Sequence, residues 1–207
     1  MKSARTSSPS RVKLFDNSFF ERFTVFPLAG FLLIWPVLLV LVAAMAAAQH
    51  SLDWLSVGMV FAGWLTWTAT EYFLHRVIFH LEPESDWLKR TIFVIHGNHH
   101  VEPNDALRNL MPPIVSIPVA GAIWGLCVWL IGPQGSWFSL GFLFGYVIYD
   151  LIHYCCHQMP MKSPMARLLK VHHMRHHFWR DGGNYAITGM FWDRLFATHI
   201  RGKTGNR

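Results

Sequence analysis

The chain has 207 residues, a length typical of a single domain, with 52% hydrophobic and 14% charged residues. Soluble globular proteins carry about 25% charged residues, so the composition excludes an ordinary soluble domain and indicates an integral membrane protein. All 18 Lys and Arg lie in residues 2–22, 76–108 and 162–207, away from the apolar runs, so the net charge of +6 does not predict a nucleic-acid partner.

The chain begins with a basic, Ser-rich tail and an aromatic approach to the bilayer over residues 1–23. Residues 24–207 are predicted to form one membrane-embedded domain. Its uncharged runs 24–49 and 54–70 are each read as a membrane span. The run 109–149 is broken by Gly132-Pro133-Gln134-Gly135, which predicts a hairpin of two further spans at 113–131 and 136–153. The expected fold is therefore all-α, with about four transmembrane helices.

The positive charges also predict sidedness. The connections near residues 50 and 133 are short and lack Lys and Arg, whereas the N-terminus, the 75–110 connection and the C-terminal segment hold every positive charge. By the positive-inside rule, both termini lie in the cytoplasm. The histidine-rich segments described next share that side, so a cytosolic helical cap is expected on a multi-pass membrane protein.

Ten histidines fall in four groups beside these apolar runs, with the patterns H-x4-H, H-x2-HH, H-x3-H and H-x2-HH. Imidazole is the commonest metal-ligating side chain, and no structural role needs so many in so short a stretch. The predicted metal ligands are His75, His80, His96, His99, His100, His153, His157, His173, His176 and His177.

Helical geometry divides these ligands into two sets. Residues four apart share a helix face, so the outer pair of each H-x2-HH grips one ion while the middle residue reaches a second ion. The i, i+5 spacing of His75 and His80 fits a helix that ends or loosens there. The hypothesis is one ion held by His75, His80, His96, His100 and His176. The other would be held by His99, His153, His157, His173 and His177.

About five imidazoles per ion exceed the four ligands of structural zinc and fit a five- or six-coordinate centre with an open position. Non-haem iron suits oxygen chemistry, so two iron ions are the expected cofactors, with O2 as co-substrate. Zinc normally binds more tightly than iron(II) and can replace it in purified protein.

Two carboxylates at span ends, Glu71 and Asp150, lie one helical turn before His75 and His153. They are predicted either to orient the imidazoles from behind or to be helix-end charges in the headgroup zone. Trp64, Trp67, Phe144 and Tyr146 are candidates to line an acyl channel. His50, His172 and His199 are expected to be structural. A larger polar set either meets a substrate head group or caps helices: Asn104, Asp105, Arg108, Asn184 and Tyr185.

Over residues 55–200 the chain resembles the integral-membrane fatty acid hydroxylase/sterol desaturase superfamily, with the fatty acid 2-hydroxylases as the nearest branch. The stretches that carry the resemblance are EYFLH at 71–75, HGNHHVEPNDALRNLMPP at 96–113, YDLIHYCCH at 149–157 and HHMRHHFWRDGGNYAITGMFWDRLF at 172–196.

The resemblance implies a membrane-bound di-iron monooxygenase that hydroxylates a lipid from the bilayer on a fatty acyl chain, and the nearest branch points to the 2-position. It also implies externally supplied electrons. Many eukaryotic members carry a fused cytochrome b5 domain for which this chain has no room, so a separate donor is expected, either cytochrome b5-like or a ferredoxin with its reductase.

Other activities remain open at this stage. A lipid desaturase, or a sterol or carotenoid oxidase, would use the same scaffold. A metal transporter would favour ligands at mid-bilayer, whereas these lie beyond the span ends. A zinc protease would need H-E-x2-H, and its glutamate is missing from all four groups.

Overall fold

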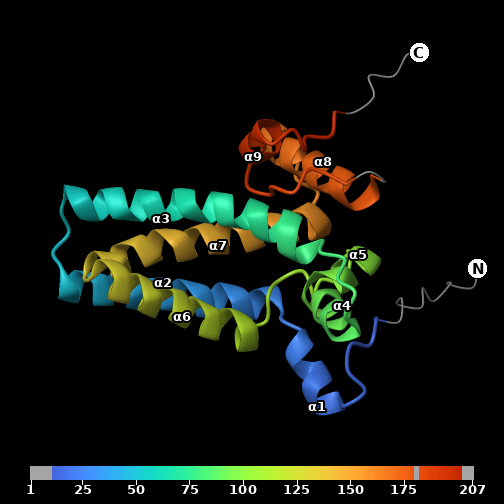
Figure 1. Cartoon of the computed structure of the whole chain (residues 1–207), viewed down its shortest axis with the longest axis horizontal. Coiled ribbons are helices and arrows are strands. Elements are labelled where there is room, and N and C mark those ends of the chain that lie inside the picture. The colour runs from blue at the N-terminus through green and yellow to red at the C-terminus, as the bar shows by residue number, and fades with distance from the viewer. Residues whose placement is uncertain (1–10, 180–181, 202–207) are drawn as a thin grey trace, which may run out of the picture.

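The computed structural model describes residues 11–179 and 182–201. These residues form helices and loops and contain no strand, which confirms the all-α prediction. Four long helices run side by side: α2 (Leu28–Gln49), α3 (Trp54–Phe73), α6 (Pro113–Ile131) and α7 (Gln134–Gln158). Figure 1 shows the two short connections, α2–α3 and α6–α7, at one end of this bundle and the remaining elements at the other end.

Three of the long helices, α2, α6 and α7, are long and apolar enough to cross a membrane. This supports the prediction of a membrane protein. Helix α3 has 20 residues, but Ser, Thr, Gly and Trp dilute its aliphatic content, and it is not among the three. The expected fourth span therefore exists as a helix of the bundle, and its place in the membrane remains a prediction.

The predicted span boundaries hold to different degrees. Helix α6 covers 113–131 as expected. The first span begins at Leu28 rather than residue 24, because Pro27 takes the extended backbone that precedes a helix. The last span is longer than predicted: α7 runs from Gln134 to Gln158, so both His153 and His157 belong to the same helix as the apolar segment.

Close contacts between α3 and α7 position the site. A Cβ added at Gly63 would come 1.9 Å from the carbonyl oxygen of Phe138, and one at Gly141 would come 1.8 Å from that of Val60. Larger side chains would force the helices apart, so the glycines set their separation. Trp67 packs edge-on against Phe142 across the same interface. The ends of α3 and α7 that carry histidines are thereby held at a fixed distance.

Short elements complete the structure at the histidine end. The N-terminal segment contains α1 (Ser18–Glu21) and a 3-10 turn (Arg22–Thr24). After α3 come α4 (Asp86–Ile92) and α5 (Asn98–Val101), and after α7 come α8 (Pro164–Phe178) and α9 (Phe191–Leu195). Figure 1 places all of these at one end of the long helices, where α9 lies beside the last turns of α3 and Trp192 donates to the hydroxyl of Thr68.

Candidate metal centre

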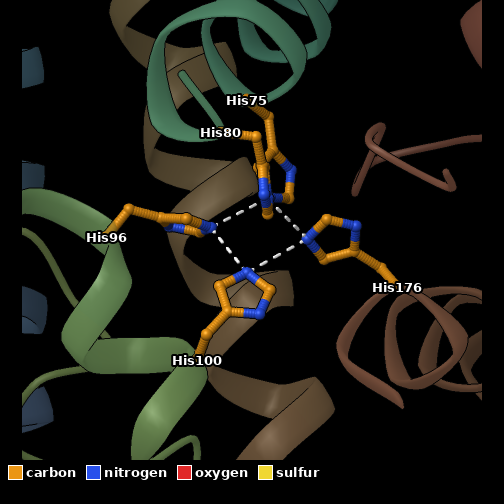
Figure 2. Close-up of side chains that lie close together, drawn as sticks. All are labelled: His75, His80, His96, His100 and His176. Atoms are coloured by element: carbon orange, nitrogen blue, oxygen red, sulfur yellow. Dashed lines mark hydrogen bonds between the residues drawn. The ribbon is translucent and has the colours of Figure 1, made fainter. Parts of the chain in front are cut away.

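Two π-helical turns place the first histidines. A π-helix over Leu74–Phe79 continues α3, and a second over Phe93–Gly97 joins α4 to α5. In a π-helix the backbone hydrogen bonds span five residues instead of four, which widens the turn, and such turns are frequent at functional sites. His75 and His80, five apart, therefore point into the same space (Figure 2). The predicted loosening of the helix is present, in the form of this π turn.

Five imidazoles converge in the first group. Figure 2 shows His96 and His100 entering from one side, His176 from α8, and His75 with His80 from the end of α3. Their Nε2 atoms form a chain of contacts: 3.1 Å from His75 to His96, 2.9 Å from His96 to His100, 3.2 Å from His100 to His176, and 3.0 Å from His176 to His80.

The second group has the same pattern, with one histidine from α5, two from α7 and two from α8. The Nε2 of His99 lies 2.8 Å from that of His153 and 3.0 Å from that of His177. The Nε2 of His173 lies 3.1 Å from that of His177 and 2.8 Å from that of His157. In each group, one ligand nitrogen from every residue lies within 4.8 Å of all the others. The membership of the two groups coincides with the predicted partition.

These contacts are better explained by shared cations than by hydrogen bonds between rings. The Nδ1 atoms of His75 and His176 donate to backbone carbonyls, so their Nε2 atoms carry lone pairs and can only accept. His96 and His100 would then both have to donate from Nε2, which leaves the 2.9 Å contact between them without an acceptor. Two nitrogens bound at right angles to one metal, each about 2.1 Å away, lie about 3.0 Å apart. The observed spacings match this value, so the donor set fits a metal ion in each group.

The rings are also in the protonation state that metal binding requires. Burial, together with repulsion between neighbouring imidazoles, lowers the pKa of His75, His96 and His99 well below the usual range. The same causes lower the pKa of His100 to about 4. Neutral imidazoles present lone pairs at neutral pH, so a cation binds without first displacing protons.

Backbone carbonyls orient the ligands from behind. The Nδ1 of His75 donates to the carbonyl of Tyr185 at 2.6 Å, and that of His176 donates to the carbonyl of Gly183 at 2.8 Å. In the second group, His153 Nδ1 donates to the carbonyl of Asn109 at 3.1 Å. Such partners fix the tautomer and ring orientation of metal-binding histidines. Any residue type can offer a backbone carbonyl, so the sequence does not predict which residues act as these acceptors.

The two predicted carboxylates, Glu71 and Asp150, hydrogen-bond to residues next to the histidine-holding carbonyls. Glu71 Oε1 accepts from the N–H and hydroxyl of Thr188, at 3.0 and 2.7 Å, and from the N–H of Ile187. Asp150 accepts from the N–H of Met111 at 3.2 Å and from the hydroxyl of Tyr146 at 2.8 Å. Their hydrogen bonds therefore go to loop residues and to Tyr146 and not to the imidazoles, so any support they give to the ligands is indirect. Each carboxylate instead anchors a loop whose carbonyls hold histidines, because a helical turn separates it from the ligand plane.

Sequence reasoning missed Asp193, which is fully buried. Its carboxylate accepts from the N–H groups of Tyr185 and Ala186, at 2.8 and 2.9 Å, and from the hydroxyl of Thr198 at 2.7 Å. It also receives a hydrogen bond from His172 Nε2 at 3.0 Å. Asp193 therefore fixes the segment that carries the acceptors for His75 and His176. A buried carboxylate needs hydrogen-bond donors around it, and this requirement explains why Asp193 gathers the backbone N–H groups of the loop.

The three remaining histidines lie outside both groups, as expected. His172 faces Asp193, His50 lies beside Asp53 at the opposite end of the bundle, and His199 stacks on His172. Among the other polar candidates, Asn184 has a positive φ of 55° and donates from its side chain to the carbonyl of His172. It supports the loop at 183–188 from within.

A cavity of about 510 Å³ leads from the histidines into the helical bundle. His96, His99 and His153 line it, so it touches members of both groups. Of the predicted channel residues, Trp67 and Tyr146 line the cavity, whereas Trp64 and Phe144 face outward. The remaining wall is mainly apolar and comes from α2, α6, α7 and the N-terminal segment.

Arg108 ties the N-terminal segment over this cavity. Its guanidinium is buried, donates to Glu21 at 2.6 Å and contacts the carbonyl of Val12. Arg11 adds a 2.6 Å ion pair with Asp105. These contacts place the predicted polar candidates Arg108 and Asp105 in a structural role, and they hold Leu14, Phe15, Phe20, Phe23 and Thr24 against the cavity.

A model of the fatty acid hydroxylase family matches residues 60–198, a range that contains all ten clustered histidines. The chain belongs to this family. The predicted resemblance is thereby confirmed, and so is the prediction of a fatty acid hydroxylase-type enzyme.

Individual relatives agree. The chain is 35% identical over 188 residues to a dihydroceramide fatty acyl 2-hydroxylase, FAH2, of Arabidopsis thaliana, covering 90% of this chain and 79% of that one. It is 38% identical over 146 residues to the fatty acid 2-hydroxylase of Homo sapiens, covering 68% of this chain but only 39% of the human protein. The solved hydroxylase domain of full-length scs7p superimposes with a TM-score of 0.82 at 30% identity, covering 90% of this chain and 71% of that one.

Proposed function

We propose that this chain is a fatty acyl 2-hydroxylase that inserts one oxygen atom of O2 into the C2–H bond of an acyl chain. The second oxygen leaves as water, so each turnover consumes two electrons and two protons. The observation that carries the proposal is the apolar cavity that ends on histidines of both groups. A long apolar cavity reaching two adjacent cation sites suits a lipid chain and does not suit a small polar substrate.

The ten histidines would hold two iron ions, five imidazoles to each. Iron would supply the redox chemistry that activates O2, which zinc does not provide. Zinc in a purified sample would reflect its tighter binding rather than the working metal. The protein's own contribution is to hold the ring nitrogens through the carbonyls of Tyr185, Gly183 and Asn109.

The cavity would position the acyl chain and keep water from the reacting carbon. Ile114 and Val119 on α6, with Phe20 near α1, line the cavity and are also exposed on the outer surface. This edge offers the acyl chain an entrance from the bilayer between α6 and the N-terminal segment. Trp67 and Tyr146 would contact the chain deeper inside, and water exclusion there would protect the reaction.

The orientation follows from charge. The connections 50–53 and 132–133 lack Lys and Arg and lie at the end of the bundle opposite the histidines. We assign the histidine end to the cytoplasm by the positive-inside rule, with α3 as the fourth span. Of the predicted segment 1–23, residues 1–10 lie outside the described part of the chain, and residues 11–23 would lie at the membrane interface. Phe19 and Phe20, both more than half exposed, would enter the headgroup region. Electrons would then come from a separate cytoplasmic donor.

Expression in a bacterial host under isotopically labelled O2 tests this function. Total lipids of cells making the wild type should contain acyl chains that gain one labelled oxygen at C2, located by fragmentation in the mass spectrometer. His99→Ala and His176→Ala should abolish this gain, while His50→Ala, remote from both groups, should retain it. Loss of two hydrogens without label would identify a desaturase and contradict the proposal.

A further inference from the structure

A second hollow, a groove of about 370 Å³, lies along the outer face of α8. Val171, Met174 and Phe178 give it an apolar floor, and Arg167, Lys170 and Arg175 stand around that floor. Phe178 is 74% exposed, so most of its ring is available for contact. The groove is separate from the lipid cavity and shares no lining residue with it.

Among the described residues that line this groove, the charged side chains are all cationic. Residues 160–179 contain four cations, with Lys162 joining the three that line the groove, and no Asp or Glu. Among the described residues, Asp193 contacts α8 through His172, and its carboxylate is buried. An apolar centre with a charged rim is typical of a protein–protein contact, and a cationic rim selects an acidic partner.

The groove also lies next to the candidate metal centre. The ring of Phe178 lies 6.2 Å, centroid to centroid, from the ring of His177, whose Nε2 belongs to the second histidine group. A partner seated on Phe178 is thus separated from a metal ligand by one side chain. The rate of electron transfer between proteins falls steeply with distance, so a docking position this close to a metal ligand is favourable.

We propose that this groove docks an acidic one-electron carrier protein; this rests on the proposed function, which needs two electrons per turnover. Each docking event would oxidise one reduced carrier and reduce the metal centre by one electron, so two events supply one reaction with O2. Redox partners of this kind form small, short-lived interfaces, for which a shallow groove suffices. Helix α8 lies beyond the ends of the long helices, which favours a water-soluble protein over the bilayer as occupant (Figure 1).

Charge reversal tests the docking site directly. Full-length wild type and a Lys162→Glu/Arg167→Glu variant are reconstituted in vesicles of neutral phosphatidylcholine, and their affinity for soluble cytochrome b5 and for a plant-type ferredoxin is measured. At least one carrier should bind the wild type, more weakly as salt is raised, and bind the variant roughly tenfold less tightly. Lys89→Glu on α4, an exposed cation far from the groove, serves as the matched control and should bind like wild type.

A second readout separates electron delivery from chemistry. Iron-loaded protein is reduced chemically, mixed once with O2, and the hydroxylated lipid is counted. The variant should equal wild type here and fall only when the carrier supplies electrons. Any of three results would overturn the docking site. Carrier affinity could be the same in the variant as in wild type, or Lys89→Glu could lose as much affinity as the variant. The third result is an affinity difference that is seen only when anionic lipid is added to the vesicles. If pre-reduced wild type forms no hydroxylated lipid while carrier affinity responds as expected, the proposed function fails and the docking site stands.

Discussion

The buried imidazole of His172 donates to the buried carboxylate of Asp193 at 3.0 Å, one residue before the metal-site candidate His173. Asp193 also receives the N–H of Tyr185, whose carbonyl accepts from His75. A histidine outside both groups and an aspartate from α9 are therefore linked to the geometry of the first group. This arrangement shows why a residue that touches no ligand nitrogen can still control metal binding.

Asp193→Asn should reduce metal binding at the first group. The amide has one acceptor oxygen where the carboxylate has two, so at least one buried donor loses its partner, at a cost of about 1–3 kcal/mol. The loop carrying the carbonyls of Gly183 and Tyr185 then loosens. Metal analysis should show loss of up to one ion per chain, with the second group retained. Asp16→Asn, a fully exposed control, should keep the wild-type content; identical metal content in both variants would contradict this role.

Ala120→Phe should shorten the acyl chains that are accepted. Ala120 lines the cavity on α6, so a phenyl ring there fills space that the chain would occupy. Hydroxylation of long chains should fall at least about tenfold, relative to shorter chains, because overpacking costs about 1–3 kcal/mol. Leu126→Phe, on the exposed side of the same helix, is the control. Lipid profiling by mass spectrometry would refute the cavity's role if both variants left the chain-length distribution unchanged.

Glu21→Ala should release the N-terminal segment from the cavity. The substitution removes the nearer of two carboxylates from the buried guanidinium of Arg108 and leaves only Asp105, at 4.0 Å, and a poorly paired buried charge is unfavourable. Hydrogen exchange and limited proteolysis should both increase in residues 11–24, while metal content stays at the wild-type value. Removing the exposed acid of another ion pair, by Asp86→Ala, should have neither effect. Equal protection in Glu21→Ala and wild type would show that the ion pair does not hold this segment.

The metal-free protein should lose stability as the pH falls. The pKa values of the clustered histidines lie below their unfolded value of about 6.5, and that of His100 lies at about 4. Below about pH 6.5 the unfolded chain therefore binds more protons than the folded one, so the free energy of unfolding decreases with acidity and is restored above that pH. Thermal melts of chelator-treated protein between about pH 7.5 and pH 5 should show this decrease. A flat or rising melting temperature toward acid would contradict it.

Local patterns account for what the sequence predicted well. The bounds of α6 follow from an apolar run with Pro at its start and a Gly-Pro turn at its end. The membership of the two histidine groups follows from which residues of the four short motifs share a helix face. The sequence does not predict the acceptors at Gly183, Tyr185 and Asn109, because irregular loop backbone places these carbonyls, with a positive φ at Gly183, and the type of side chain does not. The Arg108–Glu21 pair joins residues 87 apart, beyond any periodic signal.

The number of metal ions per chain tests the central claim most directly. Protein purified in mild detergent and loaded anaerobically with iron(II) should hold two ions per chain by elemental analysis and native mass spectrometry. His96→Ala should remove the ion of the first group and His157→Ala that of the second, while His199→Ala keeps both. A single ion in the wild type, or two ions retained in both His96→Ala and His157→Ala, would contradict the two five-histidine centres.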